Sequence, residues 1–251
     1  MTRAARPVRV TVRGLIGTGL VFAIAATCVR LGFWQLDRLG QRQAVNEVLT
    51  ERMTAPPFPL TGSLSDTTGL RYRQASAQGT WDGERSIVLP GRSYQGVPGA
   101  HVLTPLRLET GSGVLVNRGW MPAADAATVD STVLEMSGGV RVEGLIDAFP
   151  GRDASLARRA GIIPSTGSFR RVWYAIDETA LRAQFPYRLL DVSLQLVASP
   201  DAPAYPVRLA APPLDQGPHL GYAIQWFSFA AIALIGWGVM VLRNRGEEPA
   251  S

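Results

Sequence analysis

The 251-residue chain has two histidines, and one of them stands where it could bind a metal-containing ring. His219 immediately precedes a long apolar run, and on a helix Tyr222 and Trp226 would share its face. The positive end of the helix dipole disfavours imidazolium there, which keeps the imidazole neutral and able to bind a metal. Histidine commonly ligates haem iron, so an apolar ring with its metal on His219 could lie there. The alternative is an interfacial histidine beside an ordinary belt of aromatic side chains.

The rest of the sequence carries no signature of an enzyme. It contains no G-x-S-x-G, P-loop, H-E-x-x-H, paired-cysteine or strand-following G-x-G-x-x-G motif. The other histidine, His101, stands at the entry to a predicted strand, where a satisfied surface or core residue is expected. The single cysteine, Cys28, excludes a disulfide scaffold. We therefore expect a protein that is not an enzyme.

The net charge of +5 comes from the N-terminal end of the chain. Every basic residue is an arginine, and between Asp37 and Pro218 the arginines and the acidic residues balance. The surplus lies in a short arm beside the first apolar run, which is typical of membrane orientation and unlike a nucleic-acid footprint. No nucleic-acid partner is expected.

Two apolar runs predict transmembrane helices near the two ends of the chain. The second run, Leu220 to Leu242, has 23 residues without a charge, which corresponds to about 34 Å of helix. The first run, Gly14 to Val29, must extend through Arg30 to about Leu36 to span a bilayer. Arg30 would then reach toward the outer headgroups.

Small residues predict how these two helices pair. Gly19, Ala23 and Thr27 recur at every fourth position of the first helix. Small side chains let membrane helices approach closely. We therefore expect this stripe to face Ala230 and Ala233 of the second helix.

Arginines near the helix ends predict the orientation. They precede the first helix, and Arg243 and Arg245 follow the second, so both termini are expected in the cytoplasm and the middle of the chain outside it. This describes a multi-pass protein of a bacterial cell membrane, in contact with the lipid bilayer. The alternative is a signal peptide with an A-x-A site at residues 23–25, but cleavage there would fall inside the apolar run. The residues before Cys28 fit a lipidation site poorly.

The chain divides into seven predicted segments. They are a basic arm (1–13), a transmembrane helix (14–36), a stalk and linker (37–59), a β-rich domain (60–197), a proline-rich spacer (198–218), a second transmembrane helix (219–242) and a cytoplasmic tail (243–251). The prolines near residue 57 end the stalk because they remove backbone donors.

The middle segment has the pattern of a β-rich domain. Short runs between glycine-containing turns predict strands at 71–81, 86–89, 100–108, 114–121, 140–146 and 190–196. The last run alternates strictly, which predicts a half-buried antiparallel strand. Aspartates that can cap helices predict short helices at 153–160 and 177–185. The fold class is thus a membrane protein with two transmembrane helices flanking an extracytoplasmic β-rich α+β domain, either a curled antiparallel sheet or an open barrel.

Several short segments resemble one known family. Residues 31–38 read L-G-F-W-Q-L-D-R, similar to the L-G-x-W-Q-x-x-R signature of the Surfeit locus protein 1 family, with Gly32, Trp34, Gln35 and Arg38 matched. The likeness continues at 79–81, at 104–106, at 219–227 and in V-N-R-G-W-M-P, which contains Asn117, Arg118, Gly119 and Trp120. One departure is the Gly-Pro pair before His219, where the family often has Asn. Because the segments lie in register between the two apolar runs, the resemblance covers nearly the whole chain.

The resemblance implies a role in the assembly of cytochrome c oxidase. It implies insertion or handover of haem a, with oxidase subunits and the haem a synthesis machinery as partners and His219 as the haem ligand. The ring would then lie along Tyr222 and Trp226, and Arg38 could meet its propionates, as could Arg30. The alternative function is a haem-independent membrane chaperone or scaffold for oxidase subunits.

The same resemblance marks Arg118 and Trp120 in the extracytoplasmic domain. Each position has a structural alternative to a contact role. Trp120 could pack in the core, and Arg118 could be the cation of a buried ion pair.

Overall fold

The computed structural model describes residues 12–62, 64, 66–125, 128–150 and 169–246. The chain forms two compact units, one of Met1–Glu47 with Asp215–Ser251 and the other of Val48–Leu214. We name them the helix unit and the barrel unit and describe each by itself. The predicted helix at 153–160, most of the predicted arm and most of the predicted tail lie outside the described residues.

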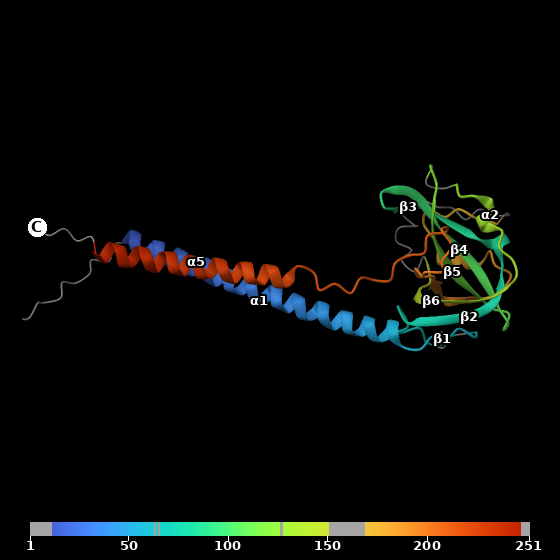
Figure 1. The fold of residues 1–251 in the computed structure, drawn as a ribbon, viewed down its shortest axis with the longest axis horizontal. Helices are drawn as coiled ribbons and strands as arrows, with labels where there is room; N and C mark the ends of the chain where they lie inside the picture. Colours follow the sequence, from blue (N-terminus) through green and yellow to red (C-terminus); the bar gives the residue numbers. More distant parts are fainter. Residues whose placement is uncertain (1–11, 63, 65, 126–127, 151–168, 247–251) are drawn as a thin grey trace, which may run out of the picture. The chain divides into compact units, whose positions relative to one another are not determined.

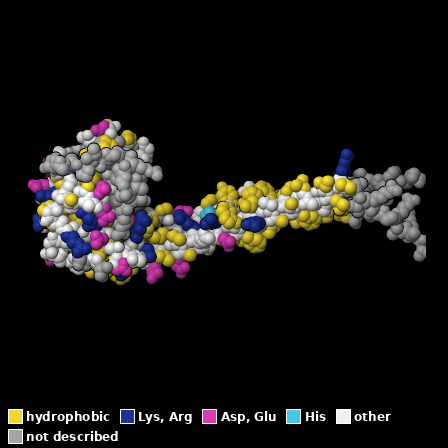
Figure 2. Space-filling model, turned by 180° about the vertical axis from the view of Figure 1, so that it is seen from behind, with side chains coloured by type: hydrophobic (Ala, Val, Ile, Leu, Met, Phe, Trp, Pro, Cys, Tyr) yellow, Lys and Arg dark blue, Asp and Glu magenta, His cyan; other side chains and the backbone are white. Residues whose placement is uncertain are grey.

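Two long helices, α1 (Val12–Thr54) and α5 (His219–Gly246), lie side by side in the helix unit (Figure 1). Each is long and apolar enough to cross a membrane. Apolar side chains cover much of the surface of the pair (Figure 2). Because α1 continues without a break past Leu36, the predicted first transmembrane helix and the predicted stalk are one helix.

The two helices run antiparallel and touch through small side chains. Ala25 and Cys28 of α1 are buried against Ala230 of α5. Farther along the pair, Trp237 Nε1 donates a hydrogen bond to Thr18 Oγ1 at 3.2 Å. Small side chains at the contact let two membrane helices approach closely, so that dispersion contacts form along their length.

Gly32 lies directly against an aromatic ring of α5. A Cβ atom at this position would lie 2.6 Å from Cε1 of Phe227, whose ring also packs edge-to-face on Phe33 at 5.4 Å. Gln35, one turn farther on, is also buried. We name Ala25, Cys28, Gly32 and Gln35 the α1 stripe.

The predicted pairing is right for α5 and wrong for α1. Ala230 is buried and Ala233 is half-buried, as expected, but Gly19, Ala23 and Thr27 are exposed. Small residues occur on more than one face of α1, and the stripe that packs has the alternating three- and four-residue spacing of a helix seam.

Seven strands form one sheet in the barrel unit (Figure 1). They are β1 (Phe58–Pro59), β2 (Gln74–Trp81), β3 (Ile87–Tyr94), β4 (Val97–Leu108), β5 (Gly113–Pro122), β6 (Gly139–Ala148) and β7 (Leu189–Gln195). The order is β1-β2-β6-β7-β5-β4-β3, and β2 also pairs with β4. Five strands therefore close into a barrel, while β3 and β1 extend it. The prediction of a β-rich domain is confirmed, and the sheet is closed rather than open.

The barrel differs from the prediction at β7. This strand is antiparallel to β6 but parallel to β5, and both of its faces are largely buried. Ser193, expected on the exposed face, is buried and donates to the carbonyl of Ala148 at 2.9 Å. Alternation alone could not reveal this, because a hydroxyl that finds an acceptor is tolerated in a core.

Three short helical segments lie in the described part of the barrel unit. The predicted helix at 177–185 is present as α4 (Glu178–Arg182), and Asp177 caps it by accepting from the Ala180 amide at 2.9 Å. The other two, α2 (Ser131–Leu134) and η1 (Gly83–Arg85), were not expected from the sequence.

The proline-rich spacer is largely part of the barrel unit. Residues up to Leu214 belong to that unit. Val207 exchanges two backbone hydrogen bonds with Trp120, at 2.8 and 2.7 Å, and Val197 forms a bridge with Leu209. The segment therefore packs along β5 instead of running free, and only residues after Leu214 join the helix unit.

Barrel closure generates a first prediction, at Gly79. A Cβ atom there would lie 2.1 Å from the backbone oxygen of Arg107 across the β2–β4 seam. Gly79→Ala should therefore destabilise the barrel by about 2 kcal/mol, a fall in Tm of roughly 4 to 8 °C for a unit of this size. Thermal unfolding of the full chain in detergent, followed by circular dichroism, measures it. Gly139→Ala is the control, since its Cβ would meet only Gly79 O at 3.9 Å; equal losses in both variants would contradict the explanation.

A second prediction concerns His101, which is half-buried on β4. Burial, with a smaller contribution from the charge of Arg92, lowers the pKa of His101 to about 4. Below its ordinary pKa of about 6.5, the unfolded chain takes up a proton that the folded chain does not. Stability should thus fall as the pH drops from 6.5 toward 4. In the His101→Gln variant, the unfolding midpoint should change less between pH 6.5 and 4 than in the native protein. Parallel plots of the midpoint against pH for the two proteins would refute the assignment.

Candidate functional site

The site at the start of α5 is built on a contact between its first residue and the α1 stripe. His219 Nδ1 lies 2.9 Å from Oε1 of Gln35. An amide oxygen only accepts, so Nδ1 donates in this arrangement, and in the neutral imidazole the lone pair is on Nε2. Nε2 has no hydrogen-bond partner among the described residues. This is the tautomer and the orientation that a metal-binding histidine needs.

The chain segment that leads into His219 is held against α1 as well. The backbone oxygen of Asp215 accepts from Arg42 Nε at 3.1 Å and from Asn46 Nδ2 at 2.9 Å. The carboxylate of Asp215 pairs with Arg42 at 3.4 Å and accepts from the Gly217 amide at 2.9 Å. Arg42 and Asn46 continue the line of the α1 stripe, so one face of α1 fixes the entry to α5.

Gly217 leaves room beside the imidazole. Its φ of +67° lies in the left-handed region, and a Cβ atom would meet Cδ2 and Nε2 of His219 at 3.3 and 3.4 Å. A side chain here would be strained and would crowd the ring nitrogen that is free to bind. The Gly-Pro departure from the family pattern therefore keeps the Nε2 edge open.

The structure brings together only part of the predicted ring site. Trp226 packs partly against Ala25, Cys28 and Ala230, and edge-to-face on Phe229 at 5.9 Å. Tyr222 is 47% exposed, so its ring is available at the surface of the pair. The helix turn after His219 thus offers one exposed and one half-buried aromatic side chain.

The two arginines that were predicted to meet the propionates have other surroundings in the structure. The guanidinium of Arg38 donates to Gln41 Oε1 at 2.8 Å and lies over the ring of Trp34, 5.5 Å from its centre. Arg30 is exposed, as expected for a residue that extends toward the headgroups. Arg42, rather than Arg38, is the arginine of α1 that meets the segment before His219.

Three residues of the V-N-R-G-W segment of β5, Asn117, Gly119 and Trp120, make structural contacts. Asn117 Oδ1 accepts from the Gly119 amide at 3.1 Å. Gly119 has a φ of +124°, and a Cβ there would meet the backbone oxygen of Val207 at 2.2 Å. Trp120 is 3% exposed and donates to the carbonyl of Arg92 at 3.3 Å. These three residues shape the bulged strand and dock the spacer, which favours the packing role for Trp120.

Arg118 is half-buried and is not the cation of an ion pair with any described residue. Its Nη1 donates to the carbonyl of Val133 and to Thr104 Oγ1, the latter at 3.4 Å. Burial lowers the pKa of Arg118 to about 10, so the guanidinium stays charged at neutral pH. The buried-ion-pair alternative therefore fails for the described residues.

Comparison with known proteins places these residues in a family. The model of the SURF1 family matches residues 22–231. The chain belongs to the SURF1 family. The matched span contains the α1 stripe, His219 and the whole barrel unit, so both parts of the candidate site lie within the SURF1 pattern.

SURF1 relatives occur in bacteria and in animals. The chain is 26% identical over 245 residues to a SURF1-like protein of Monosiga brevicollis, covering 92% of this chain and 90% of that protein. It is 28% identical over 225 residues to an uncharacterized SURF1-like protein of Mycobacterium tuberculosis, covering 86% and 80%. Surfeit locus protein 1 of Takifugu rubripes is 24% identical over 230 residues, covering 85% and 92%.

Sequence reasoning missed the partner of His219. Gln35 was matched to the family signature without a role, although its spacing from Gly32 and Cys28 put it on one face of α1. No group of three or more His, Cys, Asp or Glu that could hold a metal ion occurs among the described residues.

The α1 stripe generates a cross-linking prediction. Ala230→Cys in the otherwise native chain should form a disulfide with Cys28 on mild oxidation, because both side chains are buried in one contact. The control chain carries Cys28→Ala, Thr27→Cys and Ala230→Cys, which moves the first thiol to an exposed position of the helix. It should not close within one chain. Protease digestion followed by non-reducing gel electrophoresis distinguishes the two; stronger cross-linking in the control would contradict the assigned face.

Proposed function

We propose that this protein is an assembly factor for cytochrome c oxidase and that it binds haem a through His219 for handover to the catalytic subunit. Membership of the SURF1 family, known for cytochrome oxidase assembly factors, supports the first part. The single observation that supports the second is the hydrogen bond between Gln35 and His219 Nδ1, at 2.9 Å, which leaves Nε2 as the ring nitrogen available to a metal.

The residues present suit a haem whose iron needs one protein ligand. Haem supplies four nitrogen ligands of its own, so one histidine suffices where the described residues contain no cluster of ligands. Gln35 orients the imidazole, Gly217 keeps its Nε2 edge open, and Tyr222 offers an exposed aromatic face three residues away. Arg42 and Asn46 hold the backbone before His219, which limits the positions that the ring nitrogen can take.

The proposed location is a bacterial cell membrane, with both termini in the cytoplasm and the barrel unit outside. The two candidate membrane helices support a membrane location, and the bacterial relatives support the bacterial assignment. The arginines that flank the helices support the orientation. Oxidase subunits and the haem a synthesis machinery are the proposed partners.

Haem binding is tested by co-expression with haem a synthesis, purification and absorption spectroscopy. His219→Ala should remove the bound haem without unfolding the protein, because a half-buried imidazole contributes little packing. Gln35→Leu should weaken haem retention about tenfold or more, since losing the partner of a ligating histidine typically has that effect. Gln43→Leu, an exposed glutamine of α1 outside the stripe, is the matched control and should bind as the native protein does.

The same variants separate the two candidate functions. Suppose the His219→Ala protein retained haem in unchanged amount and with an unchanged spectrum. The ligand assignment would then be wrong, and a haem-independent chaperone for oxidase subunits would take its place. Loss of oxidase activity in cells together with loss of haem from the purified variant would support the carrier role.

A further inference from the structure

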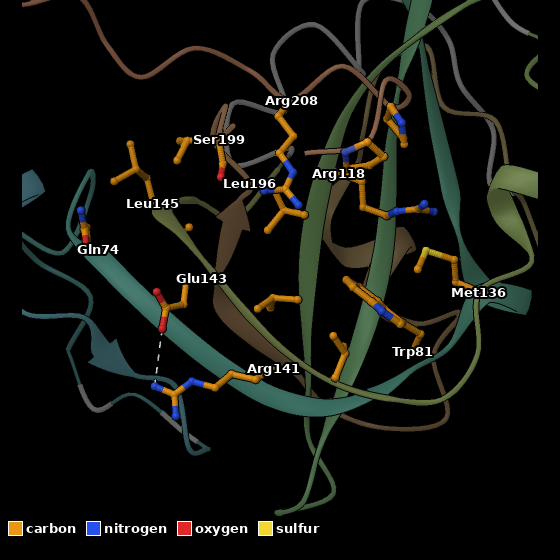
Figure 3. A pocket seen from close by; sticks show the side chains of 16 residues that line it. Gln74, Trp81, Arg118, Met136, Arg141, Glu143, Leu145, Leu196, Ser199 and Arg208 are labelled. Carbon is orange, nitrogen blue, oxygen red and sulfur yellow. Dashed lines mark ion pairs between the residues drawn. The ribbon is translucent and has the colours of Figure 1, made fainter. Parts of the chain in front are cut away.

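The barrel unit contains a pocket that the proposed haem site does not use (Figure 3). Its volume is about 580 Å³, within the range of small-molecule sites. The walls come from β2, β5, β6, the chain after α2 and the spacer after β7. All of its lining residues belong to the barrel unit.

The pocket walls carry positive charges that are unpaired among the described residues, while the lining carboxylate is already paired. Arg208 points into the pocket from the spacer, and Arg118 lines it from β5 with its guanidinium turned toward α2 (Figure 3). Neither forms an ion pair with any residue that the structure describes. The lining carboxylate, Glu143, lies across the pocket and already pairs with Arg141 at 3.5 Å, as the dashed line in Figure 3 shows. Two positive charges are therefore left without a counter-charge among the described residues.

Half-buried arginines of this kind are costly unless something compensates them. Arg118 uses Nη1 on the neutral oxygens of Val133 and Thr104, which leaves the rest of its guanidinium fork without a described partner. A carboxylate or a phosphate is the group that such a fork fits best, through paired charge-assisted hydrogen bonds.

The remaining wall is apolar. The indole of Trp81 faces the pocket together with Met136, Leu145 and Leu196 (Figure 3). Val140 and Val142 of β6 add to the same surface. A simple inorganic anion would leave this apolar surface in contact with water, whereas a molecule with an apolar body would cover it.

We propose that this pocket binds an amphipathic anion, with its carboxylate or phosphate group at Arg118 and Arg208 and its apolar body against Trp81 and Leu196. The ligand is either a free carboxylic acid with an apolar body or the headgroup end of an anionic lipid; both have the same chemistry. The proposal is independent of His219, since every lining residue lies in the barrel unit.

Equilibrium dialysis of the full chain in a neutral detergent tests the proposal, with protein-free micelles as the blank. The probes are 2-naphthoate, 2-naphthyl phosphate and the neutral 2-naphthalenemethanol, which share one apolar ring. At least one of the anionic probes should bind at least tenfold more tightly than the neutral one. Arg208→Gln should weaken that binding about tenfold or more. Arg92→Gln, an exposed arginine outside the pocket, is the matched control and should change nothing.

Two results would overturn the proposal. One is equal binding of the neutral and anionic probes, which would show an apolar groove only; the other is equal binding to the Arg208 and Arg92 variants. Arg118→Gln is a second variant with the same expected loss. If the Arg118 variant fails to fold, the Arg208 variant still decides the test. Competition with dihexanoyl phosphatidic acid assigns the source. Displacement of the probe identifies a lipid headgroup, and retained binding identifies a free acid; both outcomes support the proposal.

Discussion

The close approach of α1 and α5 along the α1 stripe is the constraint on which the histidine site depends. A Cβ at Gly32 would lie 2.6 Å from the ring of Phe227, so a larger residue at this level would require that ring to shift. Three residues farther on, the short separation lets Gln35 reach His219 at 2.9 Å. The packing of α1 against α5 thus places the amide of Gln35 beside the imidazole of His219.

A comparable constraint shapes the barrel, where glycines stand at the tightest backbone contacts. At Gly79, Gly119 and Gly144 an added Cβ would lie within 2.3 Å of a backbone oxygen on another segment. Each glycine weakens its own strand but permits a contact that no other residue allows. Gly119 matters most for the pocket, because it lets the spacer dock beside β5 and so brings Arg208 into the same wall as Arg118. The glycine of the V-N-R-G-W motif therefore helps to form the charged pocket beside it.

The sequence predicted the order of elements well and their faces poorly. Apolar length and alternation are enough to locate α5, the strands and the helix capped by Asp177, because these patterns are local. The face of α1 that packs is not a local property: in a membrane every side of the helix is apolar, so Gly19 and Ala23 looked as suitable as Ala25 and Cys28. The parallel pairing of β7 with β5 and the pocket, which takes residues from five separate segments, likewise depend on closure of the barrel. His219 was found from its residue type, and Gln35 was not, because a glutamine is informative only when its partner is known.

The chemical nature of Gln35, the partner of His219, affects how strongly the proposed site would bind haem. A carboxylate at this position would draw the Nδ1 proton, make the imidazole more basic and strengthen its bond to a metal. It would also bring a charge to the start of a membrane helix, at a cost that an amide avoids. Gln35 fixes the same tautomer and the same ring orientation with a neutral oxygen. An oriented but weakly polarised ligand binds a haem iron with less affinity than a carboxylate-supported one, and a protein that hands its haem to another needs that weaker bond. Glutamine in place of glutamate therefore suits the proposed carrier role.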